Sequence, residues 1–165
     1  AETAFEKFRA RHATVPCLSE VLERYASRAF LDIELKVPGA EDELLDALRR
    51  WPPQRGYFVS SFLPEVLRDL RRRDAHLPLG FIARRADLLR LWRNIDAEYI
   101  VPHWKLASER LLGELRDAGK KIFIWTVNDR RALPRFAELE VDGIISDKTE
   151  LLGHVLPQME RRGTT

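Results

Sequence analysis

The chain has 165 residues, of which 45% are hydrophobic and 33% are charged. This composition predicts a single soluble globular domain over residues 1–165 and argues against disorder. The formal net charge of +2 is small beside 28 basic and 26 acidic residues, so the charge gives no reason to expect a nucleic-acid partner.

Cysteine content and hydropathy indicate a cytoplasmic protein. Cys17 is the only cysteine, so an internal disulfide and a thiol-ligated zinc site are excluded. No apolar run approaches the roughly 18 residues of a membrane span. The first residues, 1–4, do not resemble a signal peptide. A targeting peptide upstream of the given sequence stays open.

Strand and helix patterns alternate along the whole chain. Short apolar segments rich in β-branched or aromatic residues predict strands at 30–36, 57–62, 79–82, 98–101, 122–127 and 141–145. Apolar residues at helical spacing predict helices around 18–25, 44–48, 64–70, 88–92, 111–115, 133–139 and 151–156. This order predicts an α/β chain with parallel strands.

Several residues predict where helices begin and end. Pro64 suits a first helical turn, and Ser108, Asp129 and Thr149 are expected to cap the three helices that follow them. Gly119 is placed to end the helix that Ser108 begins.

The strand at 30–36 has one apolar face and one face that becomes charged toward its C-terminal end. The apolar face has Leu31, Ile33 and Leu35, and the opposite face has Phe30, Asp32, Glu34 and Lys36. Such a strand suits a barrel whose site lies at the C-terminal mouth. There a carboxylate can bind a metal ion and a lysine can bind an anion.

Four motifs in this order resemble the glycerophosphodiester phosphodiesterases. Val15–Leu22 is similar to the proline-led helix start of that family, and Leu31–Lys36 is similar to its metal-ligand strand. Val59–Phe62 resembles its serine-phenylalanine strand. The most specific match is Ile124–Asn128 followed by Val141–Asp147, a tryptophan-threonine-valine-asparagine strand leading to an aspartate-glycine-isoleucine strand.

The resemblance implies a partial TIM (β/α) barrel of the PLC-like phosphodiesterase type that lacks the first strands. A histidine-arginine pair and a Glu-x-Asp motif belong to the early strands of the family, and neither precedes Pro16. A complete eight-stranded barrel typically needs about 250 residues, which agrees with a partial barrel. An unrelated doubly wound sheet is the other fold considered, and it would differ in strand order.

The resemblance also implies roles for individual residues. Glu34 matches a ligand of a divalent metal, calcium or magnesium, and Lys36 matches a lysine that contacts the phosphate. At a rise of about 3.3 Å per residue, Lys36 would lie about 6 to 7 Å from Glu34 along the strand. Trp125 matches a tryptophan of the substrate pocket, and Ser61 and Phe62 match the serine-phenylalanine pair. The expected catalytic histidines have no match in this sequence.

The implied function is metal-dependent hydrolysis of a small glycerophosphodiester to glycerol 3-phosphate and an alcohol, within lipid and glycerol metabolism. This would make the protein a phosphoric diester hydrolase. The alternative is a non-catalytic phosphate-binding or interaction module with the same fold. Glu34 and Lys36 could also form a simple ion pair, and Trp125 could belong only to the core.

Other polar residues are predicted to be structural. His103 follows a candidate strand but has no visible partner, so we expect a structural or solvent-facing histidine. The run Arg71–Arg73 is expected to be a solvated helix end. Asn128 is expected to form a turn or a cap, and Asp142 and Asp147 to be loop or capping residues.

Without earlier strands, the segment at 30–36 would be a sheet edge with unpaired backbone groups and an apolar outer face. Such an edge favours pairing with another chain. We therefore expect a homo-oligomer, a swapped assembly or a rearranged N-terminus that covers this edge.

Overall fold

The computed structural model describes residues 15–153 and contains the six predicted strands in that range. The strands are β1 (Leu31–Glu34), β2 (Tyr57–Ser61), β3 (Leu79–Ala83), β4 (Tyr99–Pro102), β5 (Lys121–Ile124) and β6 (Gly143–Ile144). All neighbouring pairs are parallel, and the strands follow one another in chain order across the sheet. A doubly wound sheet reverses its strand order, so that alternative is wrong.

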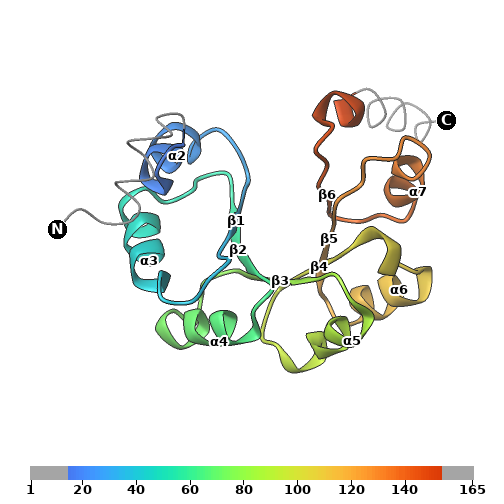
Figure 1. Cartoon of the computed structure of the whole chain (residues 1–165), viewed down its shortest axis with the longest axis horizontal. Helices are drawn as coiled ribbons and strands as arrows, with labels where there is room; N and C mark the ends of the chain where they lie inside the picture. The colour runs from blue at the N-terminus through green and yellow to red at the C-terminus, as the bar shows by residue number, and fades with distance from the viewer. Residues whose placement is uncertain (1–14, 154–165) are drawn as a thin grey trace.

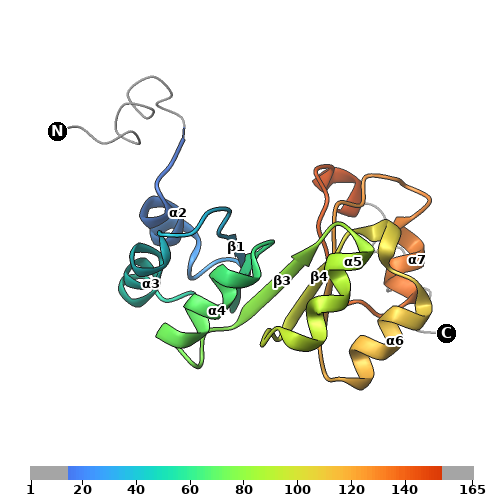
Figure 2. The same ribbon diagram turned by 60° about the horizontal axis from the view of Figure 1, so that its bottom comes forward.

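Helices cover the convex side of this sheet. They are α2 (Leu18–Tyr25), α3 (Glu41–Arg50), α4 (Pro64–Arg73), α5 (Ala86–Leu89), α6 (Glu109–Asp117) and α7 (Leu133–Glu138), with 3-10 turns at Arg90–Asn94 and Trp104–Leu106. The strands line the inside of an open arc and the helices lie outside it (Figure 1). In the turned view, α4 and α5 come to the front of the molecule, and α5 lies in front of β4 (Figure 2). The expected partial barrel is confirmed.

Most of the predicted helix boundaries are confirmed. Pro64 is the first residue of α4, and the Ser108 hydroxyl accepts the amide of Leu111 at 3.3 Å. Gly119 has a φ of +69° directly after α6, a conformation that glycine adopts without strain. Asp129 does not directly precede a helix as predicted, because α7 begins only at Leu133. Its carboxylate accepts the Arg131 amide.

Two predicted helices differ from expectation or lie partly outside the described range. The helix expected at 88–92 divides into α5 and the 3-10 turn that follows it. Residues 149–153 are helical, whereas Val155 and Leu156 of the last predicted helix lie outside the described residues. No helix in residues 15–153 combines the length and hydropathy that crossing a membrane requires.

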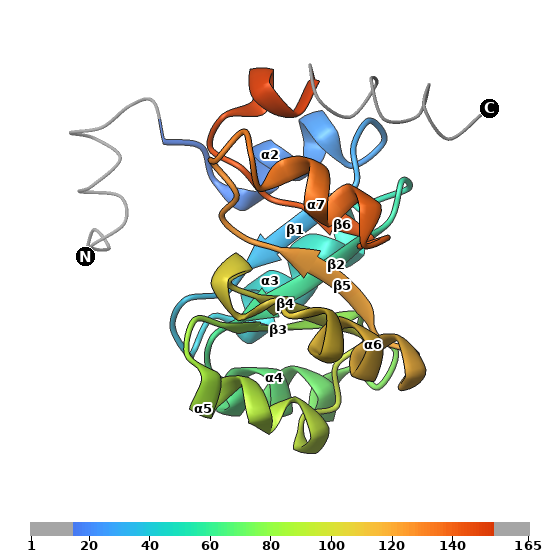
Figure 3. The ribbon, with the colours of Figure 1, turned by 90° about the vertical axis from the view of Figure 1, so that its right-hand side faces the viewer.

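The main core lies between the sheet and the helices. The apolar face of β1 packs here as predicted, because Leu31, Ile33 and Leu35 all contact this core. Its fully buried members include Leu22, Leu67, Leu70, Leu112, Leu115 and Ile122. Burial of each such side chain stabilises the fold by about 1.5–3 kcal/mol. The view from the side shows the strands with α4 and α5 beneath them and α2 and α7 above (Figure 3).

A second, aromatic cluster lies on the concave face of the sheet. Phe58 and Tyr99 stack there with ring centroids 4.2 Å apart. Phe30 lies 6.0 Å from Phe58 and 5.9 Å from Phe123, so it faces inward as the alternation predicts. Aromatic pairs at these distances add about 0.5–1.5 kcal/mol each beyond their buried area.

Two glycines allow these rings to lie close to the sheet. A Cβ atom on Gly80 would lie 2.6 Å from the Phe58 ring, and one on Gly143 would lie 2.4 Å from the Phe123 ring. Each glycine is on the strand next to that of its aromatic neighbour. The concave face therefore depends on the absence of a side chain at both positions.

The prediction that the run Arg71–Arg73 is a solvated helix end is wrong for Arg71. Its side chain is only 15% exposed and forms an ion pair with Glu98 at 2.6 Å. It also donates to the carbonyl oxygens of Ala75 and Leu77. Glu98 in turn accepts the amide of Leu79 at 2.8 Å, so this cluster joins the end of α4 to the starts of β3 and β4. The sequence prediction was wrong because Glu98 comes from a distant loop, while Ala75 and Leu77 lie in the segment directly after α4.

We predict that Gly80→Ala destabilises the protein by about 1–3 kcal/mol, because the new methyl group must displace the Phe58 ring. Gly113→Ala is the matched control, since a Cβ atom there meets nothing within 4 Å. In a helix this control is expected to be neutral or to stabilise by up to about 1 kcal/mol. Urea denaturation of both variants measures the difference. Equal stability of the two variants would show that the ring moves aside freely.

We also predict that the outer edge of β1 pairs with another chain or is otherwise covered. The amides of Leu31 and Leu35 bond to the neighbouring β2 side, so by alternation those of Asp32 and Glu34 point to the outer edge. Light scattering should reveal an assembly larger than one chain, or hydrogen exchange should show slow exchange at Asp32 and Glu34. A monomer at high concentration with both amides fully exchange-labile would contradict this.

Candidate functional site

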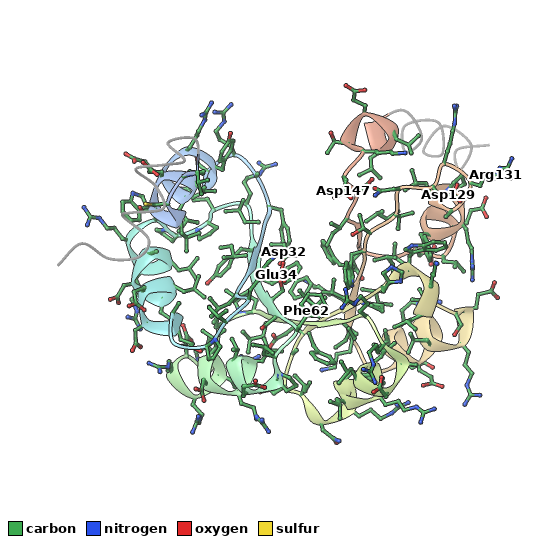
Figure 4. The ribbon with its side chains drawn as sticks, in the orientation of Figure 1. Asp32, Glu34, Phe62, Asp129, Arg131 and Asp147 are labelled. Carbon is green, nitrogen blue, oxygen red and sulfur yellow. The ribbon has the colours of Figure 1, made fainter. Side chains whose placement is uncertain are left out.

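The C-terminal ends of the strands place several polar and aromatic side chains on the concave side of the sheet. In barrels of this type, the residues that act on a ligand gather at this end. Asp32 and Glu34 come from β1, and Phe62 follows β2. All three lie toward the inside of the arc, and Asp147 lies on its opposite arm (Figure 4).

Asp32 is held by a hydrogen bond across the sheet. The Ser60 hydroxyl on β2 donates to an Asp32 carboxylate oxygen at 2.6 Å. Burial raises the pKa of Asp32, the Ser60 hydrogen bond lowers it, and the negative charge of Glu34 raises it further. The net effect is a raised pKa, so the fold disfavours the ionised form of the Asp32 carboxyl group.

Glu34 and Lys36 form an ion pair at the rim. The Lys36 ammonium lies 3.4 Å from a Glu34 carboxylate oxygen. The Lys36 side chain is 76% exposed and that of Glu34 is 28% exposed. β1 ends at Glu34, so Lys36 lies beyond the strand and its side chain turns back toward the carboxylate. An exposed pair of this kind contributes only about 0–1 kcal/mol, so it can open readily.

Ser61 has a buried hydroxyl that bonds to the main chain. It donates to the carbonyl of Leu35 at 2.7 Å and accepts the amide of Leu63 at 3.1 Å. These bonds hold the end of β2 against the segment that follows β1. The geometry assigns Ser61 to this support, and its implied contact with substrate stays a prediction.

Phe62, Trp125 and His103 form a row of ring contacts across the mouth. Phe62 and Trp125 are 5.3 Å apart at their centroids, and Trp125 and His103 are 5.4 Å apart. The Trp125 indole N–H donates to the carbonyl of Val101 at 2.9 Å, which fixes the ring. Phe62 and Trp125 both pack against the concave aromatic cluster, so Trp125 belongs to a core and also faces the mouth.

His103 was expected to be structural or solvent-facing. Its side chain caps the 3-10 turn at Trp104–Leu106, which is a structural role, and it also lies at the mouth. Its Nδ1 accepts the amide of Lys105 at 3.3 Å, so the neutral ring has its proton on Nε2. Burial lowers the pKa of His103, and the charges of Lys105 and Arg84 lower it further. The sequence feature that could have predicted this location is the position of His103 at the end of a candidate strand.

Asn128 joins two loops instead of forming a local turn or cap. Its side-chain oxygen accepts the Ser146 hydroxyl and the Asp147 amide, each at 3.0 Å, and its amide group donates to the Asp147 carboxylate at 2.8 Å. Asp142 accepts the amide of Ile122 at 2.7 Å, which is a structural role as expected. The loops after β5 and β6 are therefore fixed to each other at the mouth.

The described residues could supply part of a divalent-metal site. Asp32 and Glu34 offer carboxylate oxygens, the type of donor that calcium and magnesium prefer. Burial is the main cause of the raised pKa of Asp32, and the charge of Glu34 adds to it; a cation would relieve this repulsion. Within residues 15–153, no group of three or more His, Cys, Asp or Glu side chains could hold a metal ion. The donors fit such an ion in type but not in number.

Comparison with known protein sequences gives a consistent relationship. The Glycerophosphoryl diester phosphodiesterase family matches residues 2–151 of the chain. A glycerophosphodiester phosphodiesterase of Caldanaerobacter subterraneus subsp. tengcongensis is 30% identical over 147 residues, which are 84% of this chain and 60% of that protein. The chain spans about three fifths of the length of the curated relatives that it matches.

Solved structures share the same fold. A Silicibacter pomeroyi protein superimposes with a TM-score of 0.79 at 23% identity, over 88% of this chain and 57% of that one. An Oleispira antarctica phosphodiesterase in complex with the product sn-glycerol-3-phosphate has a TM-score of 0.68 at 22% identity, over 80% of this chain and 57% of that one. At these identities the likeness establishes the fold alone.

The raised pKa of Asp32 predicts a pH dependence of stability. Its protonated form stabilises the fold fully below the ordinary pKa of 3.8, and this stabilisation is lost as pH rises through the folded pKa. Asp32→Asn, which keeps an acceptor for Ser60, should therefore be more stable than the parent at pH 7. The difference should vanish below pH 3.8.

Asp87→Asn is the control for this measurement. The neighbouring Arg85 lowers the pKa of Asp87, so the sign of the effect should be reversed. Denaturant unfolding across the pH range measures both variants. A loss of stability in Asp32→Asn that is constant across the pH range would contradict the raised pKa of Asp32.

Proposed function

The chain belongs to the glycerophosphoryl diester phosphodiesterase family, and on this basis we propose that its protein hydrolyses glycerophosphodiesters to glycerol 3-phosphate and an alcohol. This reaction would place the protein in lipid and glycerol metabolism. The position of Glu34 and Lys36 supports the proposal, because both lie at the C-terminal rim beside the concave face that contains Trp125. The alternative, a non-catalytic module, gains no support from the comparisons.

Lys36 is the residue proposed to bind the phosphodiester. Its ammonium has a single ion-pair partner among residues 15–153 and is highly exposed, so it can turn from Glu34 to a phosphate oxygen at little cost. A lysine acts there as a mobile point charge that neutralises the anion. Phe62 and Trp125 offer an apolar wall against which the carbon skeleton of the substrate could lie.

Glu34 is proposed to hold a calcium or magnesium ion together with ligands from outside the described residues. When bound, such an ion would polarise the phosphoryl group for attack. Asp32 adds negative charge next to Glu34, and the Ser60 hydroxyl keeps its carboxylate in place. Proton transfer to the leaving alkoxide is assigned to histidines in relatives, and this sequence contains no match to them. The given chain should therefore show at most residual turnover.

We predict that Glu34→Gln abolishes calcium or magnesium binding by this chain, because it removes the charged donor and keeps the shape of the side chain. Glu65→Gln, at an exposed position on α4, is the matched control and should bind as the parent does. Isothermal titration calorimetry with each ion measures the affinity. Unchanged binding in Glu34→Gln would exclude Glu34 as a ligand.

The activity itself is tested by a phosphodiesterase assay on glycerophosphocholine with and without added divalent ion. The proposal expects weak, ion-dependent release of glycerol 3-phosphate from this chain. Lys36→Met should raise KM, because it removes the cation that binds the phosphate. Equal release by the parent and by both the Glu34→Gln and Lys36→Met variants would contradict the assigned roles.

A further inference from the structure

A groove of about 860 Å³ opens at the mouth, between the segments that follow β4, β5 and β6. Three cationic side chains line it, Lys105, Arg130 and Lys148, together with a single carboxylate, that of Asp129. Each cation comes from a different strand end. The groove thus belongs to the C-terminal rim, and its lining residue Asp129 lies on the arm of the arc opposite to Glu34 (Figure 4).

These cations have no ion-pair partner among residues 15–153. None of the ion pairs in that part of the chain involves Lys105, Arg130 or Lys148. The Asp129 carboxylate, the only acidic group of the lining, accepts the Arg131 amide at 2.8 Å. The groove therefore has an excess of positive charge that the described residues do not neutralise.

The groove walls are fixed by neighbouring contacts. The Lys105 ammonium lies 5.6 Å from the centre of the Trp104 ring, which is a favourable cation–π distance. The opposite wall includes Asn128, whose bonds to Ser146 and Asp147 hold the two loops together. A binding site with its walls held in this way loses less entropy when a ligand binds.

His103 connects the groove to the mouth. It lines the groove and its ring contacts Trp125, which in turn contacts Phe62 at the end of β2. Since Nδ1 accepts the Lys105 amide, Nε2–H of the neutral ring is a donor available to a ligand. A ligand whose phosphodiester is bound at Glu34 and Lys36 could thus extend along Trp125 to this groove.

We propose that the groove binds a phosphate group on the alcohol half of the substrate, so that the preferred glycerophosphodiesters are those whose alcohol is itself phosphorylated. This inference rests on the proposed function for the position of the scissile phosphodiester. Two lysines, an arginine and an imidazole donor suit a phosphomonoester, which has about two negative charges at neutral pH and three acceptor oxygens.

Two ligands that differ only in that phosphate provide the test. Glycerophosphoinositol 4-phosphate should bind to the chain roughly tenfold more tightly than glycerophosphoinositol at low salt, and the difference should shrink as ionic strength rises. Calorimetry without divalent ions measures both affinities. Equal affinity for the two ligands would overturn the proposal.

Substitutions locate the effect. Lys105→Gln, Arg130→Gln and Lys148→Gln should each weaken binding of the phosphorylated ligand about threefold to tenfold, and leave the other ligand unaffected. Arg90→Gln, an exposed cation on the convex side, is the control and should change neither affinity. A preference that survives in the triple variant would place the phosphate elsewhere and overturn the proposal.

Failure of the groove proposal can be distinguished from failure of the proposed function. Calcium binding and its loss in Glu34→Gln report on the phosphodiester site, whereas the preference between the two ligands is measured without divalent ions and reports on the groove. Ion binding through Glu34 with no ligand preference would refute the groove alone. A ligand preference that depends on the three cations, together with ion binding that is unchanged in Glu34→Gln, would refute the metal-site assignment alone.

Discussion

The open arc of the sheet is built around the close packing of aromatic rings over glycines on its concave face. Phe58 lies over Gly80, and Phe123 lies over Gly143, so each large ring occupies the space above a residue without a side chain. This arrangement fills the inside of the arc with rings that touch across several strands, from Phe30 to Tyr99. Helices can then cover only the convex side, and the strand ends converge at one rim.

The rim combines charged groups with an apolar floor. Asp32 and Glu34 extend from β1 toward the inside of the arc. Trp125, which directly follows β5, packs against the aromatic cluster on the same face. Burial and the charge of Glu34 raise the pKa of Asp32, and shifted pKa values are frequent at functional sites. The basic groove at the ends of β4 to β6 gives the opposite arm the opposite charge. Separated charges of this kind would orient an extended anionic substrate across the mouth.

Features set by local sequence could be predicted, and those set by contacts between distant loops could not. The alternation in residues 30–36, the caps at Ser108 and Gly119 and the six strands follow from short-range patterns. The Arg71 cluster, the bonds of Asn128 to Asp147 and the contact of His103 with Trp125 join residues about 20 positions apart or more, and depend on which loops the barrel brings together. The ion pair of Glu34 and Lys36 was foreseen as an alternative to function, and its presence leaves both roles compatible.

Residue 34 and Trp125 should face the same concave space from opposite arms of one arc. A nitroxide label at position 34, in a Cys17→Ser and Glu34→Cys variant, measures this directly through paramagnetic broadening of the tryptophan indole N–H signals. We expect strong broadening of the Trp125 signal, and little effect on that of Trp92, which packs in the core on the convex side. Broadening of the Trp92 signal with a sharp Trp125 signal would place residue 34 outside the arc, away from the proposed site.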